Sequence, residues 1–270
     1  MTDLPGHGRV ALVTGAARGI GAATVRKLAA DGWSVLAVDR AADDDVLPYR
    51  LASKDDLEAV VRSAAGQGSA GVASFIADVR DRAALGAAVA QAESRFGGLD
   101  AAIGCAGVIA GGSPQWEVPA EQEQAVLDVD LGGVLNLARA AVPALLRRPE
   151  PRSGRFLAVA SAAATRGLPM LAAYCAAKAG VTGLIRSLAV ELAPSGVTVN
   201  GVSPGSTDTP ILAASARLYD LASAQDFAAT QPAGRVLKPE EIAEVLAFLA
   251  GLGSSAMTGS VVAADGGLAL

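Results

Sequence analysis

The residues best suited to chemistry in this sequence are a tyrosine and a lysine that lie four positions apart. Tyr174 and Lys178 would share one face of a helix, because side chains four residues apart are neighbours there. A free phenol has a pKa of about 10, and a nearby ammonium lowers it by stabilising the phenolate. Ser161 precedes the tyrosine at the expected end of a strand and could hold a substrate oxygen. The trio predicts proton transfer at an alcohol or carbonyl oxygen.

A glycine-rich loop predicts a dinucleotide site. Residues 14–21 read Thr-Gly-Ala-Ala-Arg-Gly-Ile-Gly and join a predicted strand to a predicted helix. Glycine lets the backbone approach a pyrophosphate, and a helix N-terminus offers free N–H groups and a positive dipole end. The spacing is GxxxGxG and not the general GxGxxG, so a turn with packing roles alone remains an alternative.

The end of the second predicted strand indicates which dinucleotide is bound. Asp39 could accept hydrogen bonds from the adenosine ribose and repel a 2′-phosphate, which favours NAD over NADP. Arg18 and Arg40 could instead favour a phosphate. We expect NAD.

Composition excludes several classes of protein. The 270 residues carry a net charge of −5 without a long basic run, which argues against a nucleic-acid partner. No apolar stretch of membrane-spanning length is free of charges or glycine breaks, and residues 1–8 are a polar tail unlike a secretion signal. The only histidine is His7, which excludes a Ser-His-Asp hydrolase and a histidine-rich zinc site, and we expect no metal. Cys105 and Cys175 lack a CxxC pattern, which is typical of reduced thiols in a cytoplasmic protein.

Mostly apolar strands alternate with helices along the chain. The pattern predicts one α/β domain over residues 1–270, a Rossmann-type doubly wound parallel sheet whose ligands bind beyond the carboxyl ends of the strands. Residues 41–53 are expected to form a loop, residues 210–235 a substrate loop, and Pro143 should kink or thin the end of its helix. Strands are predicted at 9–13, 33–38, 72–76, 99–104, 155–160, 197–202 and 260–264, and helices at 20–31, 55–65, 81–96, 119–146, 171–192 and 239–250.

Together these motifs resemble the short-chain dehydrogenase/reductase family over essentially the whole chain. Asp78-Val79, Ala106-Gly107, Pro204-Gly205 with Thr209, and Asp265-Gly266-Gly267 match further family elements in family order. The resemblance implies an NAD-dependent oxidoreductase that moves a hydride between a secondary or allylic alcohol, or its ketone, and nicotinamide. Tyr174 would be the general acid/base. The implied cofactor-binding residues are Gly15, Arg18, Gly19, Ile20, Gly21, Asp39, Arg40, Asp78, Val79, Ala106, Gly107, Tyr174, Lys178, Pro204, Gly205, Thr207 and Thr209.

Two positions depart from the family pattern. Cys105 stands where the family usually has asparagine, and Asp130 stands where it has a catalytic asparagine. In the family that asparagine positions a water leading to the lysine, largely through its main-chain carbonyl. Asp130 could keep this role as a catalytic residue or could raise the lysine pKa by direct attraction. Because of these changes, a non-catalytic NAD-binding regulatory protein on the same fold is an alternative.

A finer resemblance concerns the loop after the second strand. Residues 47–53, together with residues 147–151, are similar to segments of short-chain dehydrogenases coupled to the redox peptide mycofactocin, a group that includes carveol dehydrogenases. This implies tightly held NAD and an external redox carrier; a loop tolerated at the surface is the alternative. Leu47, Pro48, Tyr49 and Leu51 are expected to cover the ribose and adenine. The family also implies a homotetramer or dimer built on the two long helices, and the substrate loop suggests a small apolar alcohol or ketone.

Overall fold

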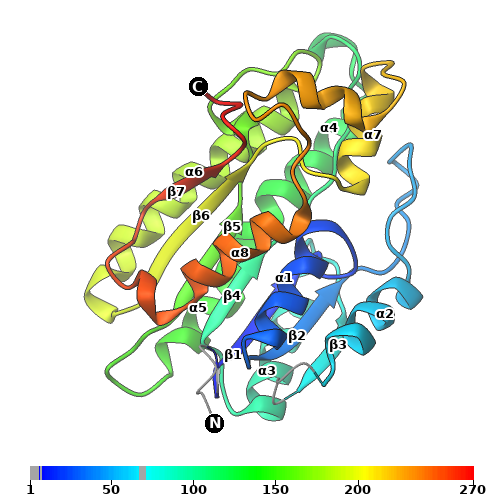
Figure 1. Cartoon of the computed structure of the whole chain (residues 1–270). Coiled ribbons are helices and arrows are strands. Elements are labelled where there is room, and N and C mark those ends of the chain that lie inside the picture. Colours follow the sequence, from blue (N-terminus) through cyan, green and yellow to red (C-terminus); the bar gives the residue numbers. More distant parts are fainter. Residues whose placement is uncertain (1–5, 7, 67–70) are drawn as a thin grey trace.

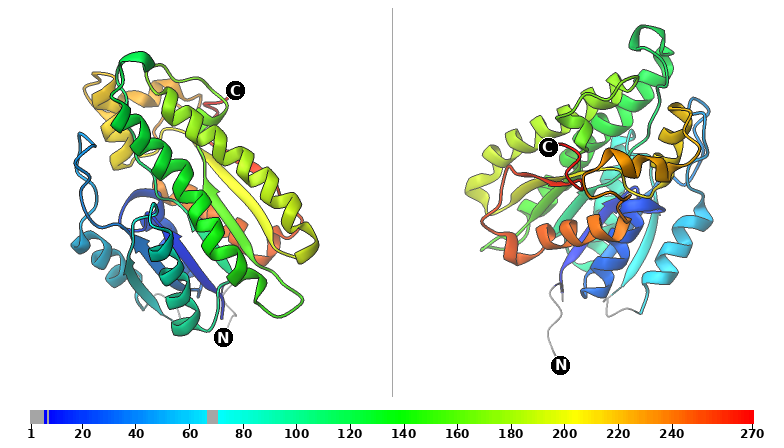
Figure 2. Two further views of the ribbon diagram at one scale, coloured as in Figure 1. Left: turned by 180° about the vertical axis from the view of Figure 1, so that it is seen from behind. Right: turned by 45° about the horizontal axis from the view of Figure 1, so that its top comes forward.

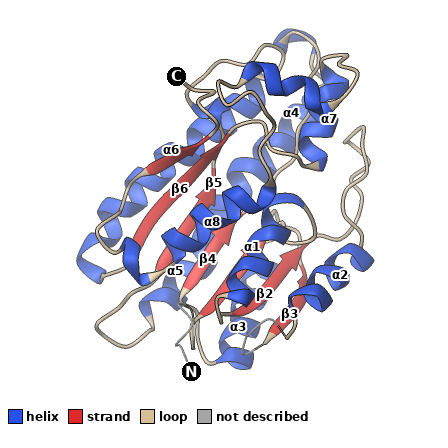
Figure 3. Ribbon diagram, in the orientation of Figure 1, coloured by secondary structure: helices blue, strands red, loops and turns tan. Residues whose placement is uncertain are grey.

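The centre of the molecule is a seven-stranded parallel sheet. The computed structural model describes residues 6, 8–66 and 71–270, so His7 and most of the N-terminal tail lie outside the described residues. The strand order is β3-β2-β1-β4-β5-β6-β7 (Figures 1 and 3). The strands are β1 (Val10–Thr14), β2 (Ser34–Asp39), β3 (Val72–Ile76), β4 (Ala101–Gly104), β5 (Arg155–Val159), β6 (Thr198–Pro204) and β7 (Val261–Ala264).

Helices cover both faces of this sheet (Figure 2). One face carries α1 (Gly19–Ala30), α2 (Lys54–Ala64) and α8 (Pro239–Ala250), and the other carries α3 (Arg82–Phe96), α5 (Gly133–Leu146) and α6 (Ala172–Leu192). Apolar side chains on both faces of the strands are buried against these helices, which explains why the strands lack a polar alternation. The predicted Rossmann-type fold is confirmed.

The strand order places a ligand site between β1 and β4. The chain runs outward from β1 through β2 to β3 and then returns to β4 on the other side of β1. The loops that follow β1 and β4 therefore diverge, and a crevice opens at the carboxyl ends of these strands.

The predicted helix at 119–146 is one helical run with a defect near its middle. It consists of α4 (Ala120–Leu127), a π-helical turn (Asp128–Gly132) and α5. Such turns insert one extra residue into a helix and occur often at functional sites. Pro143 lies inside α5, which ends three residues later at Leu146. By length and composition the run could cross a membrane, but 56% of its apolar window is buried inside the molecule, as in a core helix.

The predicted substrate loop at 210–235 contains helical structure that the sequence prediction missed. It holds α7 (Pro210–Leu218) and a 3₁₀ helix (Ala224–Thr230). The hydroxyl of Thr209 accepts a hydrogen bond from the amide of Leu212, and proline occupies the first helical position. A threonine followed by proline is a helix start signal, so the sequence did contain the information for α7.

Candidate functional site

A cavity of about 590 Å³ opens at the carboxyl ends of the strands. It is lined by all the cofactor-binding residues that the family resemblance implied and by Ser161. Asp130 is the one predicted site residue that does not line it. The structure thus brings together, in one cavity, residues that are up to 194 positions apart in the sequence, from Gly15 to Thr209.

The glycine loop leaves room for a pyrophosphate against its backbone. Gly15 has φ +65°, and a Cβ added there would lie 2.6 Å from the backbone nitrogen of Ala106. A Cβ on Gly21 would lie 2.1 Å from the carbonyl oxygen of Gly15. Helix α1 begins at Gly19, and the preceding Arg18 makes no side-chain cap, so the first amides of α1 keep their hydrogens for a ligand. This cradle fits the phosphates of a dinucleotide.

Asp39 is held in place at the end of β2. Its Oδ2 accepts the amide of Ala17 at 3.0 Å and its Oδ1 accepts the amide of Ala41 at 3.0 Å. Each carboxylate oxygen keeps lone pairs for further donors. The carboxylate therefore suits the hydroxyls of an adenosine ribose, as the NAD prediction requires.

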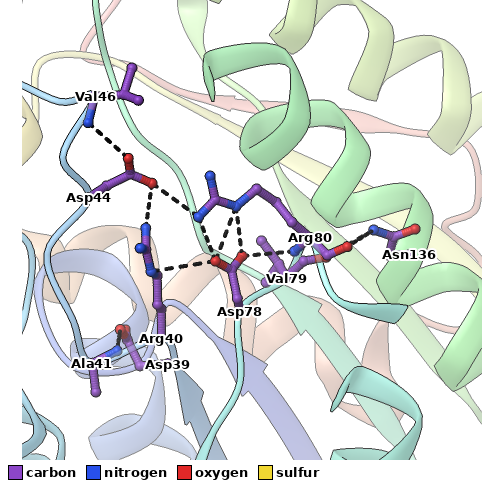
Figure 4. Close-up of polar contacts among 9 residues, drawn as sticks. All are labelled: Asp39, Arg40, Ala41, Asp44, Val46, Asp78, Val79, Arg80 and Asn136. Atoms are coloured by element: carbon purple, nitrogen blue, oxygen red, sulfur yellow. Dashed lines mark hydrogen bonds and ion pairs between the residues drawn. The ribbon is translucent and has the colours of Figure 1, made fainter. Parts of the chain in front are cut away.

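Four charged residues form a network beside Asp39 (Figure 4). Arg40 pairs with Asp44 and, at 3.4 Å, with Asp78, while Arg80 pairs with Asp78 at 2.6 Å and with Asp44 at 3.0 Å. Burial acts to raise the pKa of Asp44, but the Val46 amide and both guanidiniums hold it below its usual value. Sequence reasoning missed Asp44 and Arg80, since nothing in their spacing marks them.

The trio predicted to be catalytic, Ser161, Tyr174 and Lys178, is assembled from β5 and α6. Ser161 follows β5, and its Oγ accepts the amide of Ala163 at 3.1 Å. Tyr174 and Lys178 lie one turn apart on α6, with Lys178 Nζ 5.6 Å from the centre of the tyrosine ring. The same Nζ donates to the carbonyl of Val159 at 3.2 Å. The end of β5 therefore fixes both the serine and the lysine.

Asp130 lies behind Lys178, in the π-helical turn. It is fully buried, and its Oδ1 accepts the amide of Val108 at 2.8 Å. Its Oδ2 lies 3.3 Å from Lys178 Nζ, a contact of charge rather than of good hydrogen-bond geometry. The sequence left two roles open for Asp130, to position a water or to attract the lysine directly. The structure contains the contact that direct attraction requires.

Burial and the charges of the Asp130–Lys178 pair both shift the pKa values of Tyr174 and Lys178. Burial raises the pKa of Tyr174, Lys178 lowers it, Asp130 raises it, and a hydrogen bond with Ser161 lowers it; the net shift is upward. Lys178 lowers the pKa of Tyr174 as the sequence predicted, but the upward effects, of which burial is the largest, outweigh it. Burial lowers the pKa of Lys178, but Asp130, Tyr174 and Cys105 together more than offset this, and the net shift is upward, so the ammonium is retained. Burial raises the pKa of Cys105 to about 12, which makes its thiol a poor nucleophile.

The loop at 41–53 takes a different course from the one expected. Leu47 and Tyr49 pack on the segment after β4, where the Tyr49 hydroxyl accepts the amide of Ile109 at 2.9 Å. Pro48 and Tyr49 line a small second pocket beside α7, and of the four residues expected over the adenosine only Leu51 lines the main cavity. The expectation was wrong for the other three, because the segment after β4 buries Leu47 and part of Tyr49, and Pro48 between them stays exposed. Figure 1 shows the loop rising from β2 toward α7.

The far end of the cavity has apolar walls from three segments. Leu168 and Leu171 come from the segment before α6, Ile211 and Tyr219 from α7 and its end, and Phe227 from the 3₁₀ helix. Tyr219 and Phe227 meet edge to face with ring centres 6.0 Å apart. This end suits an apolar substrate next to the catalytic trio.

Comparison with known proteins agrees with this geometry. A family model described as enoyl-(acyl carrier protein) reductase matches residues 15–269. A carveol dehydrogenase from Mycobacterium avium, solved in complex with NAD, superposes with a TM-score of 0.91 at 29% identity, covering 97% of this chain and 98% of that one. An NAD-dependent oxidoreductase of Mycobacterium tuberculosis is 35% identical over 97% of this chain and 96% of its own length. The (−)-trans-carveol dehydrogenase of Rhodococcus erythropolis is 37% identical over 76% of this chain and 73% of its own length.

The cavity fits a dinucleotide, and these similarities extend over nearly the whole chain. The chain therefore belongs to the short-chain dehydrogenase/reductase family and is an NAD-dependent oxidoreductase similar to the carveol dehydrogenases.

Proposed function

We propose that the protein oxidises a small apolar secondary or allylic alcohol, or reduces the matching ketone, with Tyr174 as general acid/base. The observation that carries this proposal is the meeting of Ser161, Tyr174 and Lys178 with the apolar end of one cavity. The alternative of a non-catalytic NAD-binding regulator gives no reason for a buried lysine beside a partly buried tyrosine that lines the cavity. The carveol dehydrogenases among the relatives support a small cyclic alcohol as substrate.

Each residue of the trio has a distinct task in this reaction. Bound NAD supplies the hydride acceptor or donor at the substrate carbon. Ser161 Oγ donates a hydrogen bond to the substrate oxygen, and Tyr174 takes or gives the proton on that oxygen. Lys178 donates one N–H to the carbonyl of Val159 and pairs by charge with Asp130, and it also lines the cavity, where its ammonium can act on Tyr174. Asp130 acts through the lysine as a positioning residue, since it does not line the cavity.

We further propose that NAD is held tightly and that the enzyme is coupled to mycofactocin or a similar external carrier. The loop at 41–53 supports this because it is anchored along its length. Asp44 binds two arginines, the Arg50 carbonyl accepts Arg18 at 2.9 Å, and Tyr49 binds the Ile109 amide. An anchored loop beside the adenosine end would slow the exchange of cofactor.

We propose a homotetramer or dimer in the cytoplasm. Leu135 on α5 and Val190 on α6 are exposed at 45% and 78%, and both lie on the helices that the family uses for association. Cys105 and Cys175 are unpaired, which is consistent with a reducing compartment.

The direct test is a screen of cyclic secondary and allylic alcohols. The protein is purified without added NAD, desalted and assayed with NAD or with a dye as electron acceptor, and a denatured sample is analysed for released NAD(H). Near-stoichiometric NAD(H) with turnover only on the dye supports tight retention. Brisk turnover of an initially empty protein on added NAD refutes retention but leaves the alcohol dehydrogenase intact. Absence of turnover on every alcohol and ketone, with either acceptor, would favour the regulator.

A further inference from the structure

The loop at 41–53 carries three consecutive aspartates that meet different environments. Asp44 is buried, with 9% of its surface exposed, whereas Asp43 and Asp45 on either side are exposed. Asp44 Oδ1 accepts the amide of Val46 at 3.1 Å, which turns the loop and directs Oδ2 at the two arginines. Of the three aspartates only Asp44 lines the cavity, and Figure 4 shows its carboxylate facing Arg40 and Arg80.

The charges of this network balance. Arg40 and Arg80 carry two positive charges, and Asp44 and Asp78 carry two negative ones. Asp39 lies next to the network, at the end of β2, and its carboxylate is not paired with an arginine of this network. A carboxylate at this position accepts ribose hydroxyls and repels a 2′-phosphate.

Arg40 is the residue that could reverse this preference. It directly follows Asp39, at the position beside the ribose where a 2′-phosphate would project. A guanidinium binds phosphate strongly when it is free to do so. In this structure Arg40 is occupied by Asp44 and Asp78.

Asp44 is the partner on which Arg40 depends. Arg80 donates three hydrogen bonds to Asp78. Its Nε lies 3.1 Å from each carboxylate oxygen, and its Nη2 lies 2.6 Å from Oδ2. Arg40 reaches Asp78 only at 3.4 Å, without a hydrogen bond, whereas it donates a hydrogen bond to Asp44. Loss of the Asp44 charge would leave Arg80 on Asp78 and would release Arg40.

We propose that Asp44 is a specificity-determining residue that excludes NADP by holding Arg40 away from the position of a 2′-phosphate. The inference rests on the NAD dependence of the protein and not on the proposed alcohol or on tight retention. The loop at 41–53 thereby helps to select NAD over NADP, in addition to the contribution of Asp39.

The test compares Asp44→Asn with Asp45→Asn, which removes the same charge from the exposed neighbour. Asparagine can still accept the Val46 amide, so the turn should persist. Each protein is equilibrated by dialysis against equimolar NAD and NADP, and the bound dinucleotides are released by denaturation and separated by chromatography. We expect the bound NADP:NAD ratio to rise at least about tenfold in Asp44→Asn, equivalent to about 1.4 kcal/mol. In Asp45→Asn it should stay within about twofold of wild type.

Two further variants keep the test decisive. Asp44→Ser removes the charge with a different side chain that can also accept the Val46 amide, and it should repeat the rise. Adding Arg40→Gln to Asp44→Asn should return the ratio to near the wild-type value. An unchanged ratio in both Asp44 variants, or a rise that survives Arg40→Gln, overturns the proposal. No alcohol or electron acceptor is present, so a failure of the proposed reaction cannot affect the result.

Discussion

Replacing Asp130 by asparagine restores the residue that the family usually has, yet this structure predicts that the change is not silent. Both carboxylate oxygens of Asp130 face donors: Oδ1 meets the Val108 amide and Oδ2 meets Lys178 Nζ. An amide has one acceptor oxygen and an NH₂ that only donates. Asparagine can therefore accept from only one of these two donors. In one orientation its NH₂ faces the Lys178 ammonium, and in the other it faces the Val108 amide.

The size of the effect follows from the buried pair. Two unit charges 3.3 Å apart attract by about 5 kcal/mol at an effective dielectric constant of about 20. Much of this is offset by the desolvation of both groups, and removing one partner of a buried pair typically costs 3–5 kcal/mol. We expect Asp130→Asn to lower the unfolding free energy by about 3 kcal/mol, and the thermal midpoint by roughly 6–12 °C for a domain of this size.

The same change should move the pH dependence of alcohol oxidation. Asp130 raises the pKa of Tyr174 by repelling the phenolate, so its loss lowers that pKa as long as Lys178 keeps its ammonium. Oxidation requires the deprotonated tyrosine, and its rate therefore rises with pH up to the pKa of the tyrosine. In Asp130→Asn this rise should come at lower pH, and turnover should stay within about tenfold of wild type, a barrier change of about 1.4 kcal/mol.

The measurements are thermal unfolding and kcat against pH, with Asp128→Asn as the matched control. Asp128 lies in the same π-helical turn, and its carboxylate accepts a surface hydrogen bond from Gln124. The control should leave both measurements unchanged. If Asp130→Asn also leaves both unchanged, the carboxylate does not act on Lys178 and the main-chain carbonyl is what matters. A loss of turnover far beyond tenfold would instead show that the carboxylate takes part in the reaction.

Three other predictions follow from the site and the surface. Tyr174→Phe should lower turnover by about 10²–10⁴-fold, because the hydroxyl transfers the proton, while NAD bound per protein is unchanged; loss of NAD from a folded variant would contradict this role. Gly15→Ala places a Cβ 2.6 Å from the Ala106 backbone at a positive φ and should destabilise the fold by about 1–3 kcal/mol. By contrast Gly86→Ala, in the open middle of α3, should stabilise it by about 0.5–1 kcal/mol in the same denaturant titration. Light scattering at micromolar concentration should give the mass of a dimer or tetramer, and a strictly monomeric mass would refute assembly through α5 and α6.

The sheet could be predicted from the sequence because its signal is local. Each strand except the last is a short apolar run with a helix after it, and the parallel arrangement follows from that alternation. The glycine loop and the Tyr174–Lys178 pair were likewise visible, since their chemistry depends on spacing within one element. Asp39 was found because it ends a strand.

The missed features depend on contacts between segments distant in sequence. Three consecutive aspartates look alike until the fold shows that only Asp44 meets two arginines. The loop residues Leu47 and Tyr49 are apolar enough to cover a ligand, and only the structure shows that the surface after β4 takes them instead. The π-helical turn also leaves no mark in the pattern of apolar residues.

That turn divides one long helix into two halves with different neighbours. On its N-terminal side α4 packs against α6, and on its C-terminal side α5 packs against α3. Successive residues of an α-helix are rotated by about 100°, so the extra residue changes the direction in which one half faces relative to the other. Deleting a single residue here would produce a more regular helix, but it would rotate α4 away from α6 and carry Asp130 away from Lys178. The irregular turn therefore lets α4 pack on α6 and α5 pack on α3 while Asp130 stays beside Lys178.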